Sequence, residues 1–133
     1  METMENTICL DSDFIINLLR NKKEAVQWIE SHKENKFCTT AINLFEVFYG
    51  AYRLNKKSEI SSIRSFFHEL PVLDFTAENA QTAAQFAERL EKEGNMLEIR
   101  DIFIASIALN HQLPIKTYNI KHFQRIPTLQ LAD

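Results

Sequence analysis

The sequence predicts an α/β protein with a mostly parallel sheet of about five strands. Short apolar runs alternate with longer segments in which apolar residues recur every three or four positions. Strands separated by helices in this way favour parallel pairing. The 133 residues contain two glycines and no internal repeat or low-complexity segment. We therefore expect one domain over residues 1–133, long enough to bury roughly two-thirds of its unfolded surface.

The first half of the chain predicts two strands and four helices. A buried strand begins at residue 7 and ends in Asp-Ser-Asp, residue types that favour helix caps and turns. Helices are expected over 14–21 and 23–34, and a second strand over 36–42. A helix over 43–54 follows, with Asn43 as its expected N-cap, and another over 57–70 stops at Pro71.

The second half continues the same alternation. A short strand over 72–75 leads to a helix over 77–94 that Gly94 closes. A helix over 98–112 is apolar almost all round. A strand over 113–119, a helical turn over 121–126 and a last strand over 129–132 complete the predicted sheet.

Charge and cysteine content narrow the classes of partner. Fifteen Lys and Arg against eighteen Asp and Glu leave a net charge of −3, so a nucleic acid would need a local basic patch or bridging metal ions. Lys116, Lys121 and Arg125 form either such a patch or a solvated face. Cys9 and Cys38 lie in apolar stretches and are expected to be buried thiols. No segment has membrane-spanning length, so we expect a cytoplasmic protein without a membrane partner.

Three carboxylates are expected at the edge where parallel strands end. Asp11 follows the first strand, Glu46 lies early in the helix after the second, and Asp101 lies in the apolar helix. Taken singly, Glu46 is explained as a solvated residue and Asp101 as a first-turn acid that favours the helix dipole. Taken together, the acids repel and raise one another's pKa, which a divalent cation relieves. Oxygen ligands select Mg²⁺ or Mn²⁺, and such a site suits hydrolysis of phosphate esters.

Three further polar residues stand close to the same edge. Ser12 adjoins the first acid, and Thr117 and Asn119 lie where a strand gives way to a turn. Turn chemistry alone explains an Asn at a strand end. In a metal site, these side chains would hold the attacking water or a phosphate oxygen. Asp13 is expected to cap the first helix or to support Asp11.

Four blocks in order resemble a PIN-domain ribonuclease of the VapC toxin type. "ICLDSDFII" is similar to the opening strand with its first acid, and "TTAINLFEVFYGA" to the block that holds Glu46. "GNMLEIRDIFIASIAL" is similar to the block of the third acid, Asp101, and "LPIKTYNIKHFQRIPTLQL" to the closing block. Asp13 stands where the family commonly has Asn. Asn119 and His122 stand where many members have acids, which puts a second metal ion in doubt.

The resemblance implies a three-layer α/β/α sandwich with the activity of a Mg²⁺- or Mn²⁺-dependent endoribonuclease. It implies the toxin of a type II toxin–antitoxin pair, a homodimer that a small antitoxin protein neutralises. By position, Asp11, Glu46 and Asp101 are the catalytic, metal-ligating acids. Ser12, Thr117 and Asn119 would position water or RNA. The aromatic helix over 45–52 and the segment "SFFHEL" carry apolar bulk for a dimer contact or an antitoxin groove.

Two alternatives belong to other functional classes. "ICLDSDFII" also resembles the Asp-x-Asp of a haloacid-dehalogenase-like phosphatase, with Asp11 as nucleophile and Asp13 as acid. That family needs Thr or Val where Ile15 stands, and a late Gly-Asp with a further Asp that the C-terminal half lacks. The second alternative is a PIN-fold protein without activity that acts by binding a partner.

Overall fold

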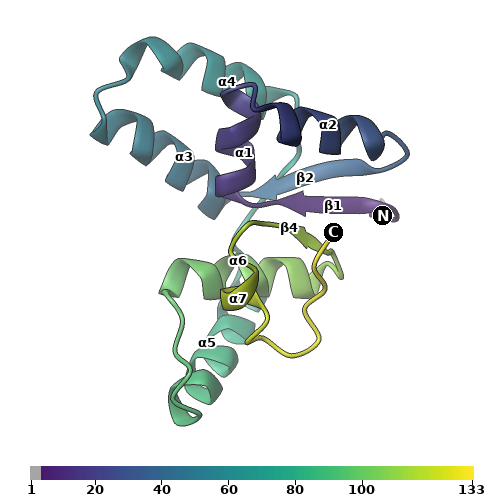
Figure 1. Cartoon of the computed structure of the whole chain (residues 1–133). Helices are drawn as coiled ribbons and strands as arrows, with labels where there is room; N and C mark the ends of the chain where they lie inside the picture. Colours follow the sequence, from purple (N-terminus) through teal and green to yellow (C-terminus); the bar gives the residue numbers. More distant parts are fainter. Residues whose placement is uncertain (1–3) are drawn as a thin grey trace.

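A four-stranded parallel sheet separates two groups of helices (Figure 1). The structure is a computed structural model that describes residues 4–133. The sheet has the order β3-β2-β1-β4, and every neighbouring pair is parallel. Its strands are β1 (Thr7–Leu10), β2 (Lys36–Thr40), β3 (Val72–Leu73) and β4 (Ile115–Lys116). Their carboxyl ends therefore meet at one edge.

The N-terminal helices cover one face of the sheet, above it in Figure 1. They are α1 (Ser12–Leu19), α2 (Lys23–Ser31), α3 (Ala41–Arg53), the short 3₁₀ element η1 (Lys57–Glu59) and α4 (Ile60–His68). Phe14 and Ile15 of α1, fully buried, pack in one cluster with Val47 of α3 and Phe67 of α4. Burial of this apolar surface attaches the four helices to β1 and β2.

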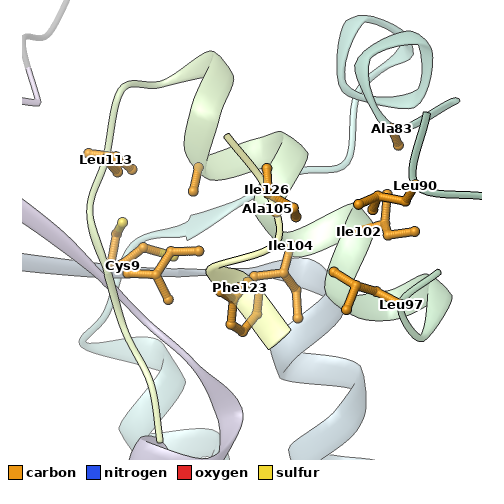
Figure 2. Close-up of a cluster of buried hydrophobic side chains, with 13 residues drawn as sticks. Cys9, Ala83, Leu90, Leu97, Ile102, Ile104, Ala105, Leu113, Phe123 and Ile126 are labelled. Atoms are coloured by element: carbon orange, nitrogen blue, oxygen red, sulfur yellow. The ribbon is translucent and has the colours of Figure 1, made fainter. Parts of the chain in front are cut away.

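The C-terminal helices cover the other face. They are α5 (Ala77–Lys92), α6 (Ile99–Asn110) and α7 (Ile120–Phe123). Figure 2 shows their cluster, in which Ile102 and Ile104 of α6 and Phe123 of α7 lie with Cys9 of β1. Helices on both faces confirm the three-layer α/β/α architecture. Cys9 and Cys38 are buried free thiols, as expected.

The sheet is smaller than the sequence predicts. The strand expected over 113–119 pairs only at Ile115 and Lys116, because the next residues turn their polar groups toward acids of the first strand's end. The last strand, expected over 129–132, is reduced to one parallel bridge between Leu131 and Ile115. Thr128 just before it has a φ of +70°, which is turn rather than strand backbone.

Two helices begin earlier than expected. The helix expected from residue 14 starts at Ser12, and its N-cap is Asp11 rather than Asp13. The helix expected from Asn43 starts at Ala41, and Thr40 caps it. Both expected caps are therefore wrong, because Asp13 and Asn43 each lie inside the helix. Their side chains bond instead to residues that follow strands: Asp13 accepts from the Tyr118 N–H, and Asn43 donates to Asp11. Across residues 4–133 we find no helix with the length and hydrophobicity that a membrane crossing requires.

Candidate active site

Asp11 stands at the carboxyl end of β1 and is almost fully buried. Its backbone N–H donates to the carbonyl of Lys116 at 2.9 Å, which continues the pairing of β1 with β4. Oδ1 accepts from the Ser12 N–H and the Asn43 Nδ2, both at 2.9 Å. Oδ2 accepts from the Thr117 hydroxyl at 2.7 Å. Donors from α1, α3 and the segment after β4 thus fix the position of this carboxylate.

Asn43 connects Asp11 to Glu46. Its Nδ2 also donates to Ser12 Oγ at 2.9 Å, and Ser12 Oγ donates to Glu46 Oε1 at 2.7 Å. The Thr40 hydroxyl donates to Asn43 Oδ1 at 2.7 Å and so orients the amide. Asn43 is fully buried, and its polar atoms all bond within the site. The chain from Asp11 to Glu46 is therefore a continuous network of short hydrogen bonds.

The segment after β4 supplies Thr117 and holds Asp13. The Tyr118 N–H donates to Asp13 Oδ2 at 3.0 Å, and the Asn119 N–H donates to Thr117 Oγ1 at 3.0 Å. Asp13 Oδ1 is buried and has no hydrogen-bond partner among the described residues. Asn119 itself is exposed, and its side chain does not cap α7. This residue joins the network through its backbone alone.

Asp101 lies in the first turn of α6 and is also buried. Its Oδ2 is 3.4 Å from His122 Nδ1. Glu98, the N-cap of α6, accepts from the Arg100 N–H at 3.1 Å. The Arg100 guanidinium lies 3.1 Å from Glu98 Oε1 and 3.8 Å from Glu46 Oε2. Arg100 thus connects the start of α6 to the α3 acid.

Burial raises the pKa of every acid in this cluster. It does so for Asp11 even though three hydrogen bonds favour the ionised form. Burial and then the charge of Asp11 raise the pKa of Asp13 to about 6. Burial, and after it the neighbouring acids, raise the pKa of Glu46 and of Asp101. The cluster therefore concentrates carboxylates whose negative charge the nearby Arg100 and His122 offset only in part.

The residue types fit a hard divalent cation, whereas the side-chain positions do not form a finished coordination sphere. The donors are carboxylate oxygens, and the orphaned Asp13 Oδ1 is a further oxygen in the same cluster. Within the part of the chain that the structure describes, no three His, Cys, Asp or Glu side chains are grouped closely enough to hold one ion. Instead, side chains of the protein contact these acids. The Thr117 hydroxyl donates to Asp11, the Ser12 hydroxyl donates to Glu46, and His122 Nδ1 lies next to Asp101 Oδ2.

Most of the predicted site residues meet at this edge. A hydrogen-bond network joins Asp11, Ser12, Glu46 and Thr117. Asp101 belongs to the cluster through charge, because Asp11 raises its pKa. Asn119 stays at the rim. Of the predicted basic residues, Lys116 and Arg125 bond elsewhere, to the Asp133 and Met96 carbonyls.

Sequence reasoning missed two residues of the site. Asn43 was expected only to cap a helix, and Arg100 was not singled out. The partners of Asn43 lie about thirty residues away in the chain. The signal available for Asn43 was its place in an otherwise apolar segment, three residues before the predicted ligand Glu46. For Arg100 it was a cation immediately before Asp101.

Comparison with known proteins places this geometry in a family. The PIN domain model matches residues 8–129. The tRNA(fMet)-specific endonuclease VapC of Salmonella typhimurium is 28% identical over 125 residues, which are 93% of this chain and 95% of that protein. Ribonuclease VapC2 of Rickettsia felis is 33% identical over 102 residues, 76% of each protein. The crystal structure of VapBC2 from Rickettsia felis bound to a DNA fragment from their promoter matches with a TM-score of 0.85. It is 27% identical and covers 95% of this chain and 97% of that one. The chain therefore belongs to the PIN-domain family, in its VapC branch.

Proposed function

We propose that this protein is a Mg²⁺- or Mn²⁺-dependent endoribonuclease, the toxin of a toxin–antitoxin pair, built as one PIN domain over residues 1–133. The observation that carries the proposal is the cluster of three mutually repelling acids at the carboxyl edge, in which Asp11 and Asp101 are buried and Glu46 is partly buried. The relatives from Salmonella typhimurium and Rickettsia felis are named as an endonuclease and a ribonuclease, which supports RNA as the substrate class.

In this proposal Asp11, Glu46 and Asp101 hold the metal ion. A bound divalent ion would supply water activation and would offset the charge that develops on the phosphorus oxygens. Asn119 and His122 stand where further acids would be needed, which favours one firmly held ion over two. The products would be a 5′-phosphate and a 3′-hydroxyl.

The surrounding residues fix the acids before substrate arrives. Thr117 and Asn43 hold the two oxygens of Asp11, and Ser12 holds one oxygen of Glu46. Such preorganisation lowers the cost of orienting the carboxylates during the reaction. Asn119, exposed at the rim, would hold water or a phosphate oxygen. Its neighbour Thr117 accepts the Asn119 N–H and fixes that turn.

The partner surfaces support the antitoxin and dimer parts of the proposal. A cleft of about 190 Å³ lies between α1, α3 and α4. Its apolar lining includes Ile16, Leu19, Val47, Ala51 and Ile63. An amphipathic helix of a small antitoxin would fit such a groove. A separate aromatic surface of α3, formed by Phe45, Tyr49 and Tyr52, is about half exposed and would suit a second copy of the chain.

The phosphatase alternative gains no support from the site. Asp13, its required acid, has Oδ2 bonded to the Tyr118 N–H and Oδ1 buried. The other residues that this family needs are also missing, since Ile15 stands at the Thr or Val position and the C-terminal half lacks the late Gly-Asp with its further Asp. We expect no turnover of a chromogenic phosphate monoester by the protein.

Replacing Asp101 with Asn tests the proposal. The variant keeps the size of the side chain but removes a charge from the proposed ligand set, so metal-dependent RNA cleavage should be lost while the fold remains. Asp74→Asn, an exposed acid at the end of β3, is the matched control and should cleave like the parent. Cleavage of total RNA and of tRNA is measured with Mg²⁺ or Mn²⁺. Equal cleavage by Asp101→Asn and the parent would falsify the site assignment.

A further inference from the structure

Arg100 is a permanent cation at an otherwise acidic site. Its guanidinium lies 3.8 Å from Glu46 Oε2 and 3.1 Å from Glu98 Oε1. The whole chain carries a net charge of −3. RNA is a polyanion whose binding depends on contacts between phosphates and cations. An enzyme of this composition therefore needs cations placed locally, and Arg100 is adjacent to the proposed ligand Asp101.

Three other basic residues near the site bond elsewhere or are charged only when protonated. Among residues 4–133, Arg100 and His122 place a basic nitrogen within 4 Å of the clustered acids. An imidazole is cationic only when it is protonated. Lys116 lies over the rings of Phe14 and Trp28 and donates to a backbone carbonyl. The Arg125 guanidinium donates to the Met96 carbonyl. Arg100 is thus a permanent positive charge next to these acids.

The contacts of Arg100 leave it free to move. Its side chain is 38% exposed, and that of its nearer partner Glu98 is 48% exposed. Exposed ion pairs are weak because water and salt screen them. The contact with Glu46 is long for a charge-assisted hydrogen bond. Leaving both carboxylates for a phosphate would therefore cost little, and the planar fork of a guanidinium matches two phosphate oxygens.

We propose that Arg100 binds an RNA phosphate beside the acid cluster, and so helps to hold the substrate in register with Asp11, Glu46 and Asp101. The proposal rests on the proposed ribonuclease function. In the free protein Arg100 screens Glu46. The weak contact lets the guanidinium turn from Glu46 to a phosphate with or without a bound ion, and an ion held by Glu46 would favour that move. Arg100 and the ion would then compete for Glu46, whereas both would favour the binding of RNA.

The test compares Arg100→Gln, Arg100→Lys and the control Arg89→Gln. Arg89 is also an exposed arginine that pairs with a glutamate, Glu93. Both residues belong to the end of α5, whereas Arg100 belongs to α6. Steady-state cleavage of a single-stranded RNA gives KM and kcat at several salt concentrations. Fluorescence anisotropy in EDTA measures RNA binding without turnover. Calorimetric titration with Mn²⁺ alone measures metal affinity.

For Arg100→Gln we expect KM and the RNA dissociation constant to rise about tenfold, and the salt slope of RNA binding to fall by about 0.7. Mn²⁺ affinity should stay equal to that of the parent or become tighter. Arg100→Lys should recover most of the binding, since it retains the charge. If RNA binding by Arg100→Gln equals that of Arg89→Gln, or if Mn²⁺ affinity and kcat fall together at constant KM, the proposal is overturned while the ribonuclease function stands. A parent that neither binds nor cleaves RNA overturns both.

Discussion

At the scale of single residues, Asn43 does the most to hold the site together. It is fully buried and donates to both Asp11 Oδ1 and Ser12 Oγ. Replacing Asn43 with Ala leaves a buried carboxylate with one donor fewer. Such a change typically costs about 1–3 kcal/mol of stability. We expect the urea midpoint of Asn43→Ala to fall accordingly, with a parallel loss of cleavage.

Asn95→Ala is the control for that prediction, because Asn95 is exposed. Its urea midpoint should match that of the parent. If the Asn43 and Asn95 variants unfold at the same urea concentration, the hydrogen-bond network does not stabilise the fold as described.

Asp13 makes stability depend on pH. Its pKa of about 6 in the folded protein lies above its usual value of 3.8, since burial and the charge of Asp11 disfavour ionisation. Folding therefore favours the protonated form. Without metal, the Asp13 carboxyl does not change the free energy of unfolding below about pH 4, where it is protonated in both states. It lowers the free energy of unfolding as the pH rises from about 4 to about 6. In urea unfolding at pH 5 and pH 8, Asp13→Asn should gain more stability over the parent at pH 8. An equal effect at both values would contradict the assigned shift.

The sequence predicted some of these residues and not others for a physical reason. Asp11 and Thr117 lie at the ends of predicted strands, and Asp101 is an acid in an apolar helix. The positions of the strand ends and the expected burial of Asp101 were therefore enough to predict that these residues meet at one edge. Asn43 and Arg100 act through contacts across elements that lie far apart in the chain. Local periodicity carries no information about such contacts.

At the scale of elements, α3 contains a glycine that its packing does not require. A Cβ added at Gly50 would meet no atom within 4 Å. Glycine inside a helix is less stable than alanine by about 0.5–1 kcal/mol. We therefore expect Gly50→Ala to raise the free energy of unfolding by this amount, measured with urea.

Gly94 provides the opposite case. It follows α5 with a φ of +70°, a conformation that favours glycine. Gly94→Ala should lower the free energy of unfolding by roughly 1 kcal/mol. A Gly94→Ala variant as stable as the parent would contradict the helix end assigned at Gly94, and a destabilised Gly50→Ala variant would contradict the open space assigned around Gly50.

Element positions were predictable where hydrophobic periodicity dominates, and element ends were not. The helix over 77–94 was nearly correct because its caps are local: Thr76 and Asn79 form a capping box at α5. The start of α1 and the end of β4 depend instead on tertiary bonds. Asp11 caps α1 while it accepts from Thr117, and the Tyr118 N–H bonds to Asp13 rather than to a strand.

At the scale of the whole molecule, parallel topology converts separate sequence blocks into one site. Because β1, β2 and β4 run in the same direction, the residues that follow them meet at one edge. Helices from both layers contribute, with Glu46 from α3 and Asp101 from α6. The sequence could predict this layered fold from alternating strands and helices. It could not predict the shape that selects one RNA or one antitoxin, which depends on surface side chains.

The central claim is that this edge holds a divalent cation, and calorimetric titration with Mn²⁺ tests it most directly. We predict that the parent and Asp74→Asn bind Mn²⁺ in the millimolar range or more tightly. Asp101→Asn should bind at least about tenfold more weakly, since it lacks one charged ligand. No Mn²⁺ binding by the parent up to millimolar concentrations would contradict the account and favour a PIN-fold protein that acts only by binding a partner. Equal binding by Asp101→Asn and Asp74→Asn would show that the ion lies elsewhere.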